Sequence, residues 1–221
     1  MNRNIVITGA NRGIGLELAR QYQQAGDKVY AVCRKESQAL QALGVSVIKD
    51  IDVSDPAAIQ MLVNALHDVP IDILINNAGI LGNESLGAID YDQMQKVIDV
   101  NGVAPLRVTE ALLGNLGSGS KIALVTSRMG SMADNTSGGT YDYRMSKAAL
   151  NAAGKSLAVD LQELGIAVAI LHPGYVQTDM VGGRGDIGAD VAAGRLIQRI
   201  EGLNLDNTGS FWHSNGELLP W

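Results

Sequence analysis

The sequence predicts an α/β protein with a single doubly wound parallel sheet and helices on both faces. Three observations predict this class. Short, continuously apolar runs alternate with longer segments of helical spacing, as expected for buried parallel strands and their crossover helices. A glycine-rich turn at residues 9–15 separates the first apolar run from the first helical segment. No linker, repeat or low-complexity segment interrupts the pattern, so we expect residues 1–221 to form one domain.

Seven strands are expected from apolar runs rich in β-branched or aromatic residues. The clearest are KVYAVC at residues 28–33, IDILI at 71–75, KIALVT at 121–126 and IAVAIL at 166–171. The others are residues 4–8, 45–49 and, near the end of the chain, 211–212.

Five helices are expected between the strands, from helical spacing and from start and stop signals. The first spans residues 14–25 and is ended by Gly26. The second begins after Ser54, the expected N-cap, with Pro56 in its first turn. The remaining three span residues 91–116, 141–164 and 190–200. Residues 182–188 contain four glycines and predict a mobile loop.

Composition narrows the classes of partner. The chain has 221 residues, a formal net charge of −6 and a pI of about 5.0. Such a chain has no general attraction for nucleic acid or an anionic membrane, and no run approaches the roughly 20 apolar residues that span a bilayer. A single cysteine and three scattered histidines show no disulfide or zinc spacing. We therefore expect a soluble cytoplasmic protein with no metal, nucleic-acid or membrane partner.

The turn TGANRGIG at residues 8–15 predicts a site for the phosphates of a dinucleotide. Glycines let the backbone approach a pyrophosphate, and the following helix N-terminus offers free N–H groups and a positive dipole end. The spacing is Gly-x-x-x-Gly-x-Gly rather than the common Gly-x-Gly-x-x-Gly. The alternative is an ordinary glycine-rich turn, which its place at the first strand-to-helix junction disfavours.

The end of the second expected strand favours NADP(H) over NAD(H). A carboxylate near this point usually binds the ribose 2′-hydroxyl, but the sequence reads CRK at residues 33–35. Arg34 suits a 2′-phosphate by charge and bidentate geometry, and Arg12 in the glycine turn is expected to bind the same phosphate from the other side. The alternative is that both arginines are solvated surface residues.

Tyr143 and Lys147 lie four residues apart and therefore share one face of a helix. Alone this pair is weak evidence, because a surface tyrosine above a solvated lysine has the same spacing. Ser127, at the end of the strand that precedes this helix, strengthens it. Carbonyl reduction requires a hydride at carbon and a proton at oxygen. A tyrosine whose pKa of about 10 is lowered by an ammonium group can supply that proton, and a serine can hydrogen-bond the developing alkoxide.

Together these features resemble the short-chain dehydrogenase/reductase family over essentially the whole chain, and in particular its C-factor and sniffer-like carbonyl reductase branch. The matching segments are TGANRGIG, NNAG at residues 76–79, Asn101, Ser127, YDYRMSKAALN at 141–151, Pro173-Gly174 and the ending GSFWHSNGELLPW. The resemblance implies a Rossmann fold and an NADP(H)-dependent oxidoreductase. Such an enzyme transfers a hydride between the nicotinamide and an aldehyde, ketone or alcohol of small size.

The resemblance also implies individual roles. Tyr143 is implied as proton donor and acceptor, Lys147 as the ligand of the nicotinamide ribose that lowers the tyrosine pKa, and Ser127 as the residue that orients the carbonyl. Asn101 is implied to hold a water in a proton relay; a local helix bend is the alternative. The implied cofactor-binding residues are Gly9, Asn11, Arg12, Gly13, Ile14, Gly15, Arg34, Asp52, Val53, Asn77, Ala78, Gly79, Tyr143, Lys147, Pro173, Gly174, Val176 and Thr178. The substrate is expected near Arg128, Met129 and Tyr175.

Several alternatives stay open on the sequence alone. A strand-end turn is the other interpretation of Asp52-Val53. The gap between Ser127 and Tyr143 is about three residues longer than in most of the family, which leaves Ser131 as a rival to Ser127. Small residues in the helix at 141–164 fit packing against the sheet or against a second copy, and the family often dimerises there, so a homo-oligomer, most simply a dimer, is expected. The alternative function is an NADP-binding signalling or regulatory protein of the C-factor type with little turnover.

Overall fold

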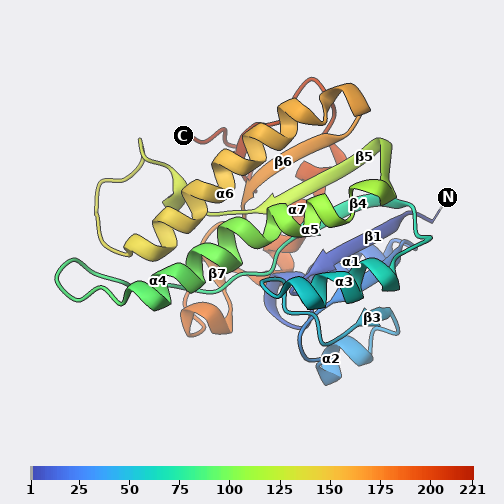
Figure 1. Cartoon of the computed structure of the whole chain (residues 1–221), viewed down its shortest axis with the longest axis horizontal. Coiled ribbons are helices and arrows are strands. Elements are labelled where there is room, and N and C mark those ends of the chain that lie inside the picture. Colours follow the sequence, from blue (N-terminus) through green and yellow to red (C-terminus); the bar gives the residue numbers. More distant parts are fainter. Residues whose placement is uncertain (1) are drawn as a thin grey trace.

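The computed structural model describes residues 2–221. Seven strands form one parallel sheet in the order β3-β2-β1-β4-β5-β6-β9 (Figure 1). Their bounds are Asn4–Thr8 (β1), Lys28–Val32 (β2), Ser46–Ile48 (β3), Ile71–Asn76 (β4), Leu116–Val125 (β5), Ala167–His172 (β6) and Phe211–His213 (β9). The chain turns back across the sheet between β1 and β4, the switch point where ligands bind in doubly wound sheets. The predicted fold class is confirmed.

Helices cover both faces of the sheet (Figure 1). One core joins the sheet to α3 (Pro56–Ala65), α5 (Ala104–Ala111) and α6 (Tyr141–Asp160), and a second joins it to α1 (Gly13–Gln24) and α7 (Ala189–Glu201). Along β1, Val6 belongs to the first core, while Ile5 and Ile7 belong to the second. Because both faces are buried, the central strands are apolar at successive positions, which is the pattern that made them recognisable.

The helix expected over residues 91–116 is interrupted, so that prediction was wrong. The structure has α4 (Tyr91–Ile98), a π-helical segment at Asp99–Val103 that contains Asn101, and then α5. Pro105, in the first turn of α5, has no N–H to donate and cannot complete the regular helical ladder. Leu116 already belongs to β5, which starts before the expected residue 121 and pairs with β4 across a register shift.

Smaller differences concern helix ends and the glycine-rich segment. The N-cap of α3 is Asp55, whose carboxylate accepts the N–H of Ala57 (2.9 Å), whereas Ser54 hydrogen-bonds Asp52 instead. The α6 helix ends at Asp160 and is followed by a short 3₁₀ turn. The expected loop at 182–188 is partly ordered, because β8 (Ile187–Gly188) pairs with β7 (Val176–Gln177). The short helix α2 (Gln38–Gln41), the two strands of this ribbon and several short 3₁₀ turns were not anticipated.

The fold brings the sequence motifs to one edge of the sheet. β1, β4, β5 and β6 are parallel, so the residues after their last positions all lie at the carboxyl edge. These are the glycine turn, the segment after Asn76, Ser127 and the Pro173-Gly174 segment. Within residues 2–221, none of the helices combines the length and apolar character needed to cross a membrane.

Candidate functional site

The glycine turn between β1 and α1 is tight, and its glycines are required by geometry. Gly9 and Gly13 have φ of +67° and +53°, in the left-handed region that glycine adopts without strain. A Cβ atom at Gly9 would lie 2.8 Å from the Cα of Ala78, and one at Gly15 would overlap the Gly9 carbonyl oxygen. The turn therefore packs directly on the segment after β4, and the N-cap residue of α1, Arg12, makes no side-chain bond to the helix.

The end of β4 is tied to the glycine turn by side chains. The Thr8 hydroxyl accepts the N–H groups of Asn77 (3.0 Å) and Ala78 (3.1 Å). In return, the amide of Asn77 donates to the carbonyl oxygens of Thr8 (3.0 Å) and Gly9 (3.2 Å). These bonds fix two of the motifs predicted for cofactor binding against each other.

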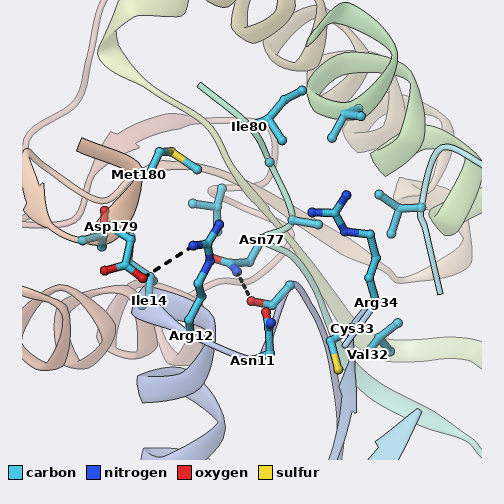
Figure 2. A pocket seen from close by; sticks show the side chains of 18 of the residues that line it. Asn11, Arg12, Ile14, Val32, Cys33, Arg34, Asn77, Ile80, Asp179 and Met180 are labelled. Carbon is cyan, nitrogen blue, oxygen red and sulfur yellow. Dashed lines mark hydrogen bonds and ion pairs between the residues drawn. The ribbon is translucent and has the colours of Figure 1, made fainter. Parts of the chain in front are cut away.

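A cavity of about 840 Å³ opens at this edge of the sheet, and Figure 2 shows part of its lining. All of the expected cofactor residues line it except three. Gly15 packs beneath Gly9, Val176 is buried in β7, and Gly174 lies against Ile187 and His213. These three lie behind the lining and shape it.

Thirteen further residues line the cavity, and nearly all of them lie outside the predicted motifs. They come from α4 and the π-helical segment, from strand ends and from the segment after Thr178. They are Val32, Cys33, Lys35, Ile51, Ser54, Ile80, Lys96, Val100, Val125, Thr126, Gln177, Asp179 and Met180. Only the basic run at the end of β2 gave a signal for any of them, namely Lys35.

Two arginines of the cavity lining pair with carboxylates of the same lining. Arg12 forms an ion pair with Asp179 (3.5 Å), drawn as a dashed line in Figure 2, and Arg34 lies 3.8 Å from Asp52. The pKa of Asp52 is lowered by its hydrogen bond with Ser54, with smaller contributions from Arg34 and Lys96. With Lys35 also in the lining, cations predominate here, and this charge suits a phosphate.

Tyr143 and Lys147 line the same cavity from α6. The ammonium of Lys147 is 5.7 Å from the centre of the Tyr143 ring and donates to the Val125 carbonyl (3.0 Å). Burial raises the pKa of Tyr143 to about 12, and a hydrogen bond with Ser127 opposes this rise. Burial also lowers the pKa of Lys147 to about 8. The expected lowering of the tyrosine pKa by Lys147 is not seen in this structure, where burial raises that pKa and only the bond with Ser127 opposes the rise.

The remaining catalytic candidates lie behind the cavity surface. Ser127 is buried, hydrogen-bonds Tyr143, and also accepts the N–H of Met129 (3.1 Å). Its rival, Ser131, instead accepts the N–H of Asp134 (3.1 Å). Asn101 is fully buried, and its side-chain amide hydrogen-bonds both the N–H and the carbonyl of Ile80 (2.8 and 2.9 Å). The side chain therefore fixes the backbone at Ile80 in this structure.

The three residues expected near the substrate are outside the cavity lining. Arg128 is held by ion pairs with Asp134 (2.8 Å) and Glu217 (2.9 Å). Met129 follows it in a 3₁₀ turn, and Tyr175 is half-exposed at the base of the β7–β8 ribbon. Sequence proximity to Ser127 and Pro173-Gly174 suggested these residues but could not give the direction of their side chains.

Comparison with known proteins decides the family. The family model for short chain dehydrogenase matches residues 3–186. The chain belongs to this family. The expected membership is thus confirmed, and the short-chain dehydrogenase fold accounts for the glycine turn, the cavity and the Tyr143–Lys147 pair at one sheet edge.

Curated and solved relatives within the family are similar along most or all of the chain. The 1-hydroxy-2-glutathionyl-2-methyl-3-butene dehydrogenase of a Rhodococcus species is 37% identical over 98% of this chain and 99% of its own. The C-signal protein of Myxococcus xanthus is 46% identical over 69% of this chain and 93% of its own. A crystal structure of a carbonyl reductase from Pseudomonas aeruginosa in complex with NADP superposes with a TM-score of 0.87, at 33% identity, over the full length of both chains.

Proposed function

We propose that this short-chain dehydrogenase is an NADP(H)-dependent carbonyl reductase for small aldehydes or ketones. The observation that carries the proposal is the layout of one cavity. Tyr143 and Lys147 line it together with the basic residues Arg12 and Arg34. The proposed proton donor, Tyr143, and the proposed phosphate ligands, Arg12 and Arg34, thus line one cavity, whose volume suits a dinucleotide. The carbonyl reductase relative solved with NADP supports the same choice of cofactor.

The residues present fit NADP(H). No side-chain cap occupies the N-terminus of α1, and Arg12 and Arg34 supply the charge that a 2′-phosphate requires. Asp52, Val53 and residues 77–79 would hold the adenosine part, and Lys147, Pro173 and Thr178 the nicotinamide riboside part. When bound, the cofactor supplies the hydride that reduces the carbonyl carbon.

The protein's own groups manage the proton. With a pKa raised by burial to about 12, Tyr143 stays protonated near neutral pH and can donate its proton to the carbonyl oxygen. The hydrogen bond between Ser127 and this phenol supports a role for Ser127 in hydrogen-bonding that oxygen. Lys147, with a pKa near 8, is mostly protonated at pH 7 and stabilises the resulting phenolate. Asn101 contributes by holding Ile80 at the cavity wall.

The test is NADPH oxidation with a panel of aldehydes and ketones, compared with NADPH binding followed by fluorescence. We expect turnover by the wild type and a loss of about 10²–10⁴ in kcat for Tyr143→Phe, with NADPH affinity retained. Wild-type turnover that survives Tyr143→Phe would overturn the role of this residue.

The similarity to the C-signal protein favours one second candidate, an NADP-binding signalling or regulatory protein with little turnover. The same assay separates the two. Tight NADPH binding without oxidation of any carbonyl in the panel supports the regulatory protein.

We further propose that residues 1–221 act as one domain in a cytoplasmic homodimer. Half-exposed apolar side chains on neighbouring elements support the dimer: Val103 and Leu106 before and within α5, and Met145 and Val159 on α6. Light scattering after size exclusion should give twice the mass of the 23.3 kDa chain, and Val159→Glu should give a monomer.

A further inference from the structure

Asp142 is a fully buried carboxylate beside Tyr143 in the first turn of α6, and the proposed proton transfer does not use it. Its Oδ1 atom accepts the backbone N–H of Tyr143 (2.8 Å) and of Glu84 (3.0 Å). Its Oδ2 atom has no hydrogen-bond partner within residues 2–221. Burying a carboxylate is costly, and these two N–H groups compensate for only part of that cost.

The carboxylate attaches α6 to the segment that follows β4. Glu84 donates its N–H to the Asp142 side chain, and its carbonyl accepts the N–H of Tyr141 (3.0 Å), so two hydrogen bonds at Glu84 join the two segments. A Cβ atom at Gly82 would overlap Asp142 Oδ2, so only glycine fits at position 82. The N-cap residue, Thr140, makes no side-chain bond to the helix, which leaves first-turn N–H groups for other acceptors.

A second connection reaches the same segment from the other side of Tyr143. The Tyr143 carbonyl accepts the Ser146 hydroxyl (2.8 Å), and Ser146 accepts the amide of Asn101 (3.1 Å). Asn101 in turn is bonded to both backbone groups of Ile80, which lines the cavity. A closed ring of hydrogen bonds therefore runs through residues 80–84, Asn101, Ser146 and Asp142, and it holds the backbone N–H and the carbonyl of Tyr143.

We propose that Asp142 is a positioning residue that closes this ring and so fixes the Tyr143 phenol relative to the cofactor cavity. The proposal rests on the proposed function of Tyr143 as proton donor. Asp142 is buried outside the cavity lining, so in this proposal it acts through the backbone of α6. Since a displacement of about 1 Å at a reacting group can lower a rate about 10²-fold, loss of the ring should reduce kcat and leave cofactor binding unchanged.

The test compares Asp142→Ala, Asp142→Asn and Gly82→Ala with the control Asp160→Ala, an exposed aspartate at the other end of α6. We expect Asp142→Ala and Gly82→Ala to lower kcat roughly 10–100-fold, with NADPH Kd within about twofold and an altered pH profile of kcat. Asp142→Asn should restore most of the rate, because an amide oxygen accepts the same two N–H groups. Asp160→Ala should match the wild type.

Amide hydrogen exchange gives a readout that does not depend on turnover. In Asp142→Ala the N–H groups of Tyr143 and Glu84 should exchange about tenfold faster or more, and in Asp142→Asn close to the wild-type rate. Unchanged exchange at these two amides in Asp142→Ala would overturn the proposed ring, whether or not the protein is active. An active wild type that is sensitive to Tyr143→Phe but indifferent to Asp142→Ala would overturn positioning alone and leave the proposed function standing.

Discussion

At the scale of single residues, burial controls the chemistry of Tyr143 and Lys147. Both side chains have lost most of their contact with water, which stabilises the neutral form of each relative to the charged form. The tyrosine pKa therefore rises to about 12 and the lysine pKa falls to about 8. The sequence predicts the spacing of the pair but contains no information about the local dielectric. That is why the expected lowering of the tyrosine pKa differs from what the structure shows.

Arg34 is the residue on which the preference for NADP(H) most directly depends. Arg34→Asp should raise the Kd of NADPH roughly 10–100-fold, because a charge-assisted contact contributes about 1.5–3 kcal/mol, and should move the preference toward NADH. Isothermal titration with both cofactors checks this.

The matched control is Arg20→Asp, the same charge change in α1 at a residue outside the cavity lining. It should leave both cofactor affinities within about twofold. If the Arg34 variant binds NADPH as the wild type does, Arg34 is not a phosphate ligand.

At the scale of elements, the sequence predicted the strands and turns that depend on local composition and spacing. Apolar runs located the central strands, and the glycine turn gave the junction of β1 and α1. The π-helical segment was missed because a helical pattern of apolar residues continues through it, and Pro105 alone did not reveal a break. The bonds of Asp142 to Glu84 and of Asn101 to Ile80 join residues distant in sequence, and no local pattern reports such contacts.

The seating of α6 on the sheet depends on Gly154. A Cβ atom there would lie 2.7 Å from side-chain atoms of both Ile170 in β6 and Leu124 in β5. Over-packing of this kind costs about 1–3 kcal/mol, and alanine's better helix propensity returns up to about 1. Gly154→Ala should therefore lower the free energy of unfolding by up to about 2 kcal/mol in urea denaturation.

Ser156→Ala, at an exposed position of the same helix, is the comparison for Gly154→Ala and should be neutral or slightly stabilising. A Gly154→Ala protein as stable as the wild type would show that α6 can move away from β5 and β6 at little cost.

At the scale of the whole molecule, the parallel topology assembles the site. Residues from the ends of β1, β4, β5 and β6, together with α6, meet at one edge of the sheet, and the cavity lining there extends from Gly9 to Met180. This arrangement keeps Lys147 in the interior, and the cost of burying its charge should lower the free energy of unfolding of the whole protein.

Stability should rise with pH because of Lys147. Its pKa is lowered from 10.5 to about 8 on folding, so between these values the unfolded chain binds more protons, and the destabilisation present at lower pH disappears. Between pH 8 and 10 the wild type should gain about 2 kcal/mol relative to Lys147→Met, which retains Tyr143. Urea denaturation without cofactor measures the difference, and parallel pH dependences of the two proteins would contradict it.

Hydride transfer to a carbonyl with Tyr143 as the proton donor can be followed by isotope transfer. Wild-type protein is incubated with NADPH deuterated at the transferring carbon and with an aldehyde or ketone that it turns over, and the product is examined by mass spectrometry and NMR. We predict one deuterium on the former carbonyl carbon, delivered to one face, and a product yield about 10²–10⁴-fold lower for Tyr143→Phe. Alcohol product that carries no deuterium at that carbon would contradict hydride transfer from NADPH. Equal yields from the two proteins would contradict the role of Tyr143 as proton donor.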